Sequence, residues 1–194
     1  MSFPSEVIER FEDGLQAARD AMEPEPSAIS LATSAKSGRL SVRTMLLKDF
    51  DETGFVFYTN TRSNKGLQLA ECPQAALCIV WKSIFRQVLV EGRVETVTDA
   101  EADAYFASRP RGSQIGAWAS LQSSVLDSRA TLEQRVAEFE QKFAGEDVPR
   151  PPHWSGYRLI PDMIEFWYGK EDRLHDRFRF TLESGKWAKQ RLYP

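Results

Sequence analysis

Residues 43–65 of the chain read RTMLLKDFDETGFVFYTNTRSNK, and the rest of the sequence can be placed around them. Two apolar runs, 43–48 and 55–60, flank a turn that contains Gly54, a pattern that predicts a β-hairpin. The second strand leads into a short helix that begins near Ser63 or Asn64. The stretch therefore predicts antiparallel β structure followed directly by a helix.

Three cations of this stretch stand where an anion could bind. Alternation along the first strand puts Arg43 and Lys48 on opposite faces, on either side of an apolar middle. Lys65 falls in the first turn of the helix, where free backbone N–H groups and the helix dipole favour an anion. A lone lysine there usually points into water. With Arg43 nearby and Ser63 and Asn64 as cap donors, a bound phosphate explains the pattern as well.

Length and composition predict one domain. With 194 residues the chain can bury a sizeable core, and a content of 42% hydrophobic and 27% charged residues is that of a globular protein. We expect a single domain over 1–194, with an N-terminal helix within 1–22 and closing strands within 157–194. No apolar run approaches the roughly 18 residues of a membrane helix, and no signal sequence is seen, so we expect a cytoplasmic protein without a membrane partner.

Charge and cysteine content exclude further classes. The net charge of −3 argues against a nucleic-acid partner, since such domains usually carry a basic excess, and any cationic site must be local. Cys72 and Cys78 lack the spacing of a zinc site, so we expect free buried thiols and no metal.

Apolar periodicity predicts the remaining elements. Helices are expected at 5–21, 98–108 and 128–143, and strands at 28–33, 75–81, 87–97, 157–160 with 164–168, 173–182 and 187–192. Gly92 predicts a bulge or a close backbone approach within its strand. Segment 109–124 has no clear period, and a loop that only connects two helices does not need its Ser, Gln and Arg. Closely spaced strands indicate a closed or half-closed antiparallel barrel.

The segment from Arg173 to Arg177 carries the sharpest local pattern of charge. As part of a strand it sends Arg173, His175 and Arg177 to one face, where they repel one another unless something neutralises them. An exposed face paired with Asp176 explains this as well as a ligand does. His153, among prolines, is expected to be a packed or exposed loop histidine. The apolar stripe of the helix at 128–143 is expected to join the core.

Motifs of nucleophilic catalysis and of nucleotide hydrolysis are absent from the sequence. It contains no obvious pair of carboxylates for acid and base, no Gly-x-Ser-x-Gly, no Walker pattern and no Gly-x-Gly-x-x-Gly. If the protein is an enzyme, a cofactor must bring the reactive group.

Several uncommon strings occur in a recognisable order: RTMLLK (43–48), FYTN (57–60), RQV (86–88), YF (105–106), SRP (108–110), SQIGAW (113–118), QS (122–123), IEFW (164–167), RLHDR (173–177) and RL (191–192). Together they resemble the pyridoxamine 5′-phosphate oxidase family over almost the whole chain. The resemblance implies a mainly β, α+β fold, an FMN-binding split β-barrel of antiparallel strands with flanking helices. It also implies a homodimer with FMN at the interface. The implied reaction oxidises pyridoxamine or pyridoxine 5′-phosphate to pyridoxal 5′-phosphate, with O2 as acceptor and H2O2 as product.

The resemblance also implies roles for individual residues. Those expected to bind FMN are Arg43, Lys65, Gln122 and Ser123 at its phosphate end, and Lys48, Tyr58, Thr59, Gln87, Trp167 and Arg177 elsewhere. Those expected to bind the substrate are Lys48, Tyr105, Arg109 and Ser113 at its phosphate, and Arg173 and His175 over its ring as the catalytic pair.

Two departures from the family pattern and two alternatives stay open. Asn64 stands where the family commonly has arginine, and Arg62 is the cation that could replace it; the chain also starts without the basic arm that this family often carries. One alternative is a flavin oxidase of the same fold acting on another substrate, such as a phenazine precursor. The other is a binder of FMN or pyridoxal phosphate without catalysis, although a second phosphate set argues against it.

Overall fold

The computed structural model describes residues 3–194, and over these residues nine strands form one antiparallel sheet. The strands are β1 (Ala28–Ser34), β2 (Leu40–Leu46), β3 (Asp49–Asp51), β4 (Gly54–Asn60), β5 (Gln74–Trp81), β6 (Arg86–Thr96), β7 (Trp154–Tyr168), β8 (Asp176–Glu183) and β9 (Lys186–Leu192). The helices are α1 (Ser5–Asp20), α2 (Asn64–Glu71), α3 (Asp99–Ser108), α4 (Arg111–Ala119) and α5 (Arg129–Lys142), with 3₁₀ turns η1 (Lys82–Ile84) and η2 (Glu171–Arg173).

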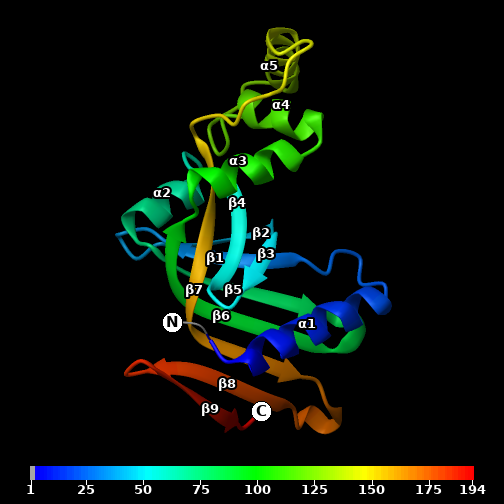
Figure 1. Cartoon of the computed structure of the whole chain (residues 1–194), viewed down its shortest axis with the longest axis vertical. Helices are drawn as coiled ribbons and strands as arrows, with labels where there is room; N and C mark the ends of the chain where they lie inside the picture. The colour runs from blue at the N-terminus through cyan, green and yellow to red at the C-terminus, as the bar shows by residue number, and fades with distance from the viewer. Residues whose placement is uncertain (1–2) are drawn as a thin grey trace.

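The sheet divides around β7, which is 15 residues long. One edge of β7 pairs with β6 along most of its length, whereas the other edge pairs with β4 over 154–159 and with β8 over 163–168. The sheet therefore curls and opens into two parts that share one strand (Figure 1). The half-closed antiparallel barrel expected from the sequence is confirmed.

A bulge lets β7 continue through a proline. The pairing register of β6 and β7 shifts between Glu91 and Gly92, opposite Pro161. A Cβ atom at Gly92 would collide with the carbonyl oxygen of Ile160, so only glycine fits there. The predicted bulge is confirmed, but the predicted break between strands at 157–160 and 164–168 is wrong, because a bulge accommodates the proline within one strand.

The predicted long hairpin around Gly54 is wrong in its pairing. The Asp51 carboxylate accepts hydrogen bonds from the backbone N–H groups of Thr53 and Gly54, which closes the expected turn. Only β3 precedes that turn, however, because the strand that carries Arg43 pairs along its whole length with β1. The chain changes partner at Lys48, whose backbone N–H donates to the Val56 carbonyl oxygen.

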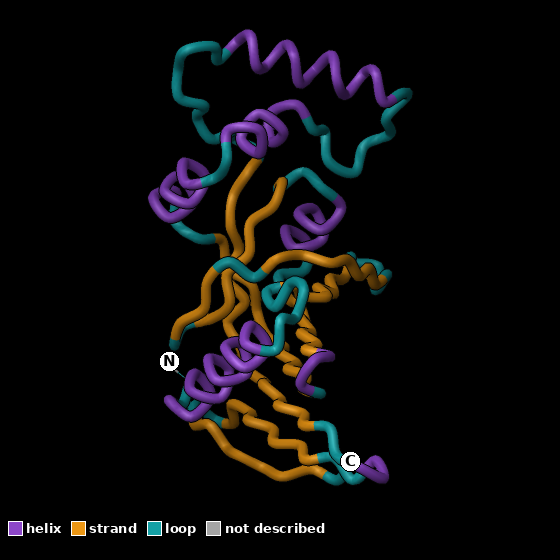
Figure 2. Tube along the Cα trace, turned by 90° about the vertical axis from the view of Figure 1, so that its right-hand side faces the viewer, coloured by secondary structure: helices purple, strands orange, loops and turns teal. Residues whose placement is uncertain are grey.

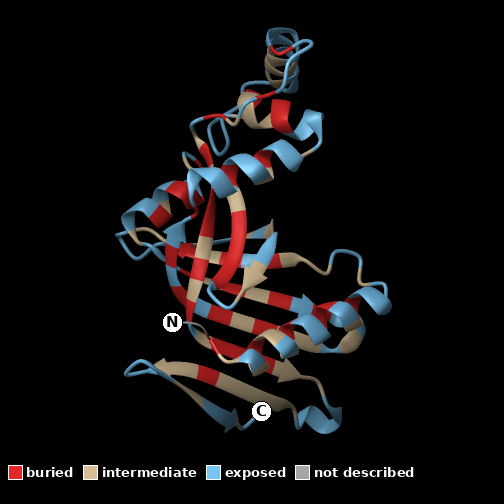
Figure 3. Cartoon of the chain, in the orientation of Figure 1, coloured by how far each residue is buried: buried red, intermediate tan, exposed pale blue. Residues whose placement is uncertain are grey.

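Helix α1 covers one face of the sheet and builds the main core. Its stripe of Val7, Phe11, Leu15 and Ala18 has helical spacing and is buried, and the Phe11 ring contacts aromatic rings of the sheet edge-on. Figure 3 shows this buried band under α1. The N-terminal helix expected within 1–22 is confirmed over the residues described.

Helices α3, α4 and α5 lie together at one end of the long axis, and β8 and β9 lie at the other (Figures 1 and 2). Helix α3 begins with the predicted capping box of Thr98 and Glu101. Part of segment 109–124, treated above as a loop, is helix α4. The apolar stripe of α5 joins a second core cluster, as expected: Phe143 is buried in it, and the half-buried Val136 and Phe139 pack against it.

Two smaller expectations can be compared with the structure. Cys72 and Cys78 are free, but both are half-buried rather than buried. Among residues 3–194, no helix is long and apolar enough to cross a membrane. The cytoplasmic location stays a prediction, as does the single-domain boundary.

Candidate active site

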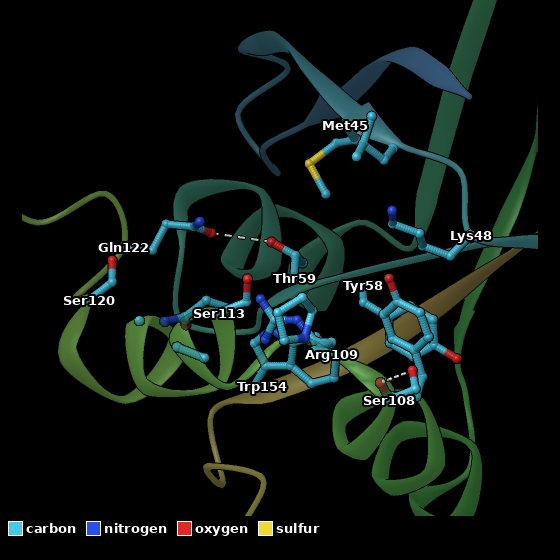
Figure 4. Close-up of a pocket in the computed structure, with 16 residues that line it drawn as sticks. Met45, Lys48, Tyr58, Thr59, Ser108, Arg109, Ser113, Ser120, Gln122 and Trp154 are labelled. Carbon is cyan, nitrogen blue, oxygen red and sulfur yellow. Dashed lines mark hydrogen bonds between the residues drawn. The ribbon is translucent and has the colours of Figure 1, made fainter. Parts of the chain in front are cut away.

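A hollow of about 670 Å³ opens between β4, the link from β2 to β3, and the helices α3 and α4 (Figure 4). Its lining residues are Met45, Leu46, Lys48, Tyr58, Thr59, Asn60, Tyr105, Ser108, Arg109, Pro110, Ser113, Gly116, Ala117, Ser120, Gln122 and Trp154. The predicted phosphate-binding set of the substrate, Lys48, Tyr105, Arg109 and Ser113, is thus brought together around one space.

Stacked aromatic rings form the floor under Arg109. The rings of Tyr58 and Tyr105 stack with centroids 4.1 Å apart, and Trp154 continues the stack 5.3 Å from Tyr58. The Arg109 guanidinium lies over Trp154, 4.9 Å from its ring centroid. This cation–π contact fixes the guanidinium without using its N–H groups, which leaves them available to an anion.

One nitrogen of the Arg109 guanidinium lacks a hydrogen-bond partner among the residues that the structure describes. This atom, Nη1, is buried. Burial lowers the pKa of Arg109, with a small opposing effect from Tyr105. An unpaired buried cation is costly, so an anion in the hollow would stabilise it.

Lys65 and Arg43 form a second cationic group beside the hollow. Lys65 is only 7% exposed, and its Nζ donates to Thr59 Oγ1 at 3.1 Å, Ser63 Oγ at 3.3 Å and Gln122 Oε1 at 3.0 Å. Burial, followed by repulsion from Arg43, lowers the pKa of Lys65 to about 8. Helix α2 starts here with Ser63 as its N-cap, so backbone N–H groups add to the positive potential.

Neutral acceptors alone hold these cations. The Arg43 Nη1 donates to the Leu31 carbonyl at 3.1 Å and to Thr33 Oγ1 at 2.6 Å, and burial lowers the pKa of Arg43. Within residues 3–194, no carboxylate pairs with Arg43, Lys48, Lys65 or Arg109. A buried lysine beside a half-buried arginine, with no acid in the described part of the chain to pair them, fits a phosphate, which supplies up to two negative charges.

The loop after α4 reaches the start of α2. Gln122 accepts from Lys65 and from Thr59 Oγ1, the latter at 3.2 Å, and Ser123 Oγ accepts from the Asn64 backbone N–H at 3.3 Å. The expected phosphate-end set of FMN is therefore gathered in one place. The side chains of Arg62 and Asn64 are both exposed.

The remaining predicted cofactor residues lie on another part of the sheet. Gln87 is directly opposite Trp167, and Trp167 is directly opposite Arg177, so the three form one row across β6, β7 and β8. Side chains in such a row project from the same face. The Trp167 ring lies 4.5 Å from the His175 ring, and both line a second hollow with Phe85.

The prediction that Arg173, His175 and Arg177 share a strand face is wrong. Strand β8 begins only at Asp176, because Asp172 and Arg173 have left-handed backbone angles, with φ of 54° and 61°, that end an extended strand. Arg173 belongs to the turn η2, and His175 Nδ1 accepts from the Lys170 backbone N–H at 3.1 Å. His153 is a half-buried loop residue, as expected.

Two functional candidates were missed in the sequence. Trp154 lies under the Arg109 guanidinium, but it belongs to none of the sequence motifs quoted above. Its position beside Tyr58 follows from the pairing of β4 with β7. Glu165 is 1% exposed inside the run IEFW, and a lone acid in an apolar strand is a signal that could have marked it.

Fold and site together define a curled antiparallel barrel with separate places for two anionic groups. A family model described as "Pyridoxamine 5′-phosphate oxidase" matches residues 15–143, and one described as "Pyridoxine 5′-phosphate oxidase C-terminal dimerisation region" matches 154–194. The chain belongs to the pyridoxamine 5′-phosphate oxidase family. It is therefore an oxidoreductase with FMN as its cofactor, and the second match supports a homodimer.

Curated relatives are similar over nearly their whole length. A pyridoxine/pyridoxamine 5′-phosphate oxidase from Myxococcus xanthus is 58% identical over 191 residues, 98% of this chain and 93% of that protein. The protein of the same name from Brucella canis is 54% identical over 192 residues, 98% of this chain and 95% of that protein.

Solved structures share the fold. PhzG from Burkholderia lata, in complex with tetrahydrophenazine-1-carboxylic acid, superposes with a TM-score of 0.93 at 34% identity, covering 98% of this chain and 94% of that one. A pyridoxamine 5′-phosphate oxidase-related, FMN binding protein from Nostoc punctiforme has a TM-score of 0.80 at 16% identity, with 100% of each chain covered, and shows the fold alone.

Proposed function

We propose that the protein oxidises pyridoxamine 5′-phosphate and pyridoxine 5′-phosphate to pyridoxal 5′-phosphate. The observation that carries this proposal is the presence of two cationic groups without a carboxylate partner among the described residues: Lys48 with Arg109 lining one hollow, and Arg43 with Lys65 beside it, behind Thr59 and Gln122. A protein that held only a flavin phosphate would need one group. FMN, when bound, would supply the hydride acceptor, with O2 as the final oxidant and H2O2 as its product.

The residues around the hollow would bind and orient both ligands. Arg43, Lys65, Gln122 and Ser123 would hold the FMN phosphate, because their donors and the start of α2 meet there. Each charge-assisted hydrogen bond to phosphate contributes about 1.5–3 kcal/mol, so a few of them fix a ligand's position. Hydride transfer then depends on that alignment.

The substrate phosphate would lie deeper, over the aromatic floor. Lys48, Tyr105, Arg109 and Ser113 would bind it, and the stack under Arg109 keeps the guanidinium in place. Arg173 and His175 would cover the pyridine ring beside the flavin. Neither of these two lines the hollow of the same chain.

A second copy of the chain would complete the site. Strand β7 has Trp154 at one end, in the hollow, and Trp167 at the other, in the row with Gln87 and Arg177. The two tryptophans are 13 residues apart. At about 3.3 Å per residue, that is roughly 43 Å of strand, longer than FMN itself. In a homodimer the row of one subunit can face the hollow of its partner, which places FMN at the interface.

Purification and assay test this function directly. We expect a yellow protein that releases peroxide with each of the two B6 phosphates. Arg173→Ala and His175→Ala should retain bound FMN but lose turnover by about a hundredfold, the range that positioned acid–base or orienting groups contribute. A yellow protein inactive on both phosphates, or normal turnover in both variants, would contradict the proposal.

The match to PhzG favours one other substrate class. That structure holds a tetrahydrophenazine carboxylic acid and is 34% identical to this chain, so a flavin oxidase acting on such a compound is the second candidate. It would be preferred if the yellow protein ignored both B6 phosphates and oxidised a reduced phenazine carboxylate. A protein that binds FMN or pyridoxal phosphate but turns over none of these substrates would instead indicate a carrier or sensor.

A further inference from the structure

Glu165 is a buried acid that the proposed reaction does not use. It lies on β7 opposite Leu89 of β6 and Arg179 of β8, and only 1% of it is exposed. Its side chain points away from the core, because the alternating neighbours Ile164 and Phe166 are the ones that join the core cluster. A buried carboxylate is costly unless it is paired and hydrogen-bonded.

The pairing of Glu165 is divided between two arginines. Its Oε1 accepts from Arg177 Nε at 2.8 Å and lies 2.7 Å from Arg177 Nη2. Its Oε2 accepts from Arg179 Nε at 3.0 Å and from Nη2 at 2.8 Å. One carboxylate thus fixes two guanidinium planes, and the cluster keeps a net positive charge.

These contacts fix the Arg177 guanidinium without occupying all of its N–H groups. Its Nη1 also donates to the Tyr193 carbonyl oxygen at 3.1 Å. Of its five N–H groups, one on Nη1 and one on Nη2 remain available. Arg177 stands at the end of the row formed with Gln87 and Trp167, so its side chain projects from the face of the sheet where the flavin is expected.

We infer that Glu165 is a positioning residue that holds the Arg177 guanidinium in the orientation in which it binds FMN. The inference rests on the proposed function, which assigns Arg177 to the flavin. If Glu165 only attached β8 to β7, its loss would change FMN affinity to the same extent with or without Arg177. If Glu165 positions Arg177, its loss changes FMN affinity only when Arg177 is present.

A double-mutant cycle on FMN affinity separates the two roles. Apo-protein is titrated into FMN, and quenching of flavin fluorescence gives Kd for wild type, Glu165→Gln, Arg177→Ala and the double variant. We expect each single variant to weaken FMN binding by about tenfold or more, the range for a lost charged hydrogen bond. The double variant should then bind within about twofold of Arg177→Ala.

Arg179→Ala is the matched control, because it removes the other partner of the same carboxylate. It should leave the FMN Kd within about twofold of wild type, whatever it does to thermal stability. Glu165→Asp keeps the charge but draws the carboxylate back, and we expect a smaller rise in Kd. If Glu165→Gln fails to fold, Glu165→Asp takes its place in the cycle.

Two results would overturn the inference. One is an FMN Kd for Glu165→Gln, or for its replacement, equal to wild type while Arg177→Ala binds weakly. The other is a double variant in which the two losses multiply. Unchanged FMN binding by Arg177→Ala would instead remove the assigned role of Arg177, and peroxide release by the FMN-saturated wild type tests the proposed function separately.

Discussion

Lys65 and Arg43 are the residues in which burial and charge conflict most directly. Both are cations held by neutral oxygens, and Arg43 adds to the burial that lowers the pKa of Lys65. The folded pKa of Lys65, about 8, lies below its ordinary value of 10.5. The unfolded chain therefore binds more protons than the folded one between these values, and the stability of the apo-protein should rise with pH across this interval.

FMN should reverse this behaviour of Lys65. A phosphate beside the ammonium group favours its charged form, so FMN binding above pH 8 should be accompanied by proton uptake. We expect the FMN affinity to fall as the pH rises from 8 to 9.5, by at most about tenfold per pH unit. Titrations of FMN at several pH values measure this slope.

Lys65→Met serves as the comparison. It should bind FMN more weakly at pH 7 and show little change in affinity up to pH 9.5. The same slope in Lys65→Met and wild type would mean that another group takes up the proton.

Arg109 should distinguish phosphorylated from unphosphorylated substrates. Because Arg109 lines the hollow, Arg109→Met should lower kcat/KM for pyridoxine 5′-phosphate about ten- to a hundredfold and leave the FMN Kd unchanged. Arg111→Met is the control, because Arg111 donates to the Phe143 and Glu146 carbonyls and does not line the hollow. Equal losses in both variants would refute the role.

At the scale of elements, the bulge between β6 and β7 is the most constrained feature. Gly92→Ala places a Cβ against the Ile160 carbonyl, a backbone atom that cannot move aside alone. We expect a loss of about 2 kcal/mol or more in the free energy of unfolding, measured with denaturant. Gly112→Ala, where nothing lies within 4 Å, should be neutral or slightly stabilising. A tolerated Gly92→Ala would mean that the register shifts freely.

Local signals predicted the elements whose cause is local. The stripe of α1, the capping box of α3 and the bulge at Gly92 are all as expected. The expected pairing of the Arg43 strand with the strand at 55–60 was wrong because the choice of partner and register is not specified by apolar alternation. Helix α4 was missed because it lacks a strong apolar period, and the turn at Arg173 because a positive φ in a non-glycine residue has no sequence signal.

For the candidate site too, groupings of residues close in the sequence were predictable, whereas the placement of distant segments was not. Motif residues that follow one another closely were expected at the cofactor together: Tyr58, Thr59 and Gln122 line the hollow, and Ser123 contacts Asn64 at the start of α2 beside it. The separation of Arg173 from Lys48 within one chain could not be foreseen. It depends on the length of β7, which the sequence divides at Pro161.

At the scale of the whole molecule, the two groups of site residues lie toward opposite ends of one chain, and the homodimer is expected to bring them together. Mixing subunits tests this. Arg109→Met is altered in the hollow and His175→Ala beside Trp167 of the row, so each homodimer should be nearly inactive. A randomly mixed population should regain about a quarter of wild-type activity, because half of the dimers contain one intact site. No recovery on coexpression would mean that each chain builds its site alone.

The length of β7 has a consequence for how the catalyst behaves in dilute solution. Because neither end of the strand can reach the other, an isolated chain would own two half-sites and no whole one. Specific activity should then depend on protein concentration, falling on dilution below the dissociation constant of the dimer and returning with a lag when the solution is concentrated again.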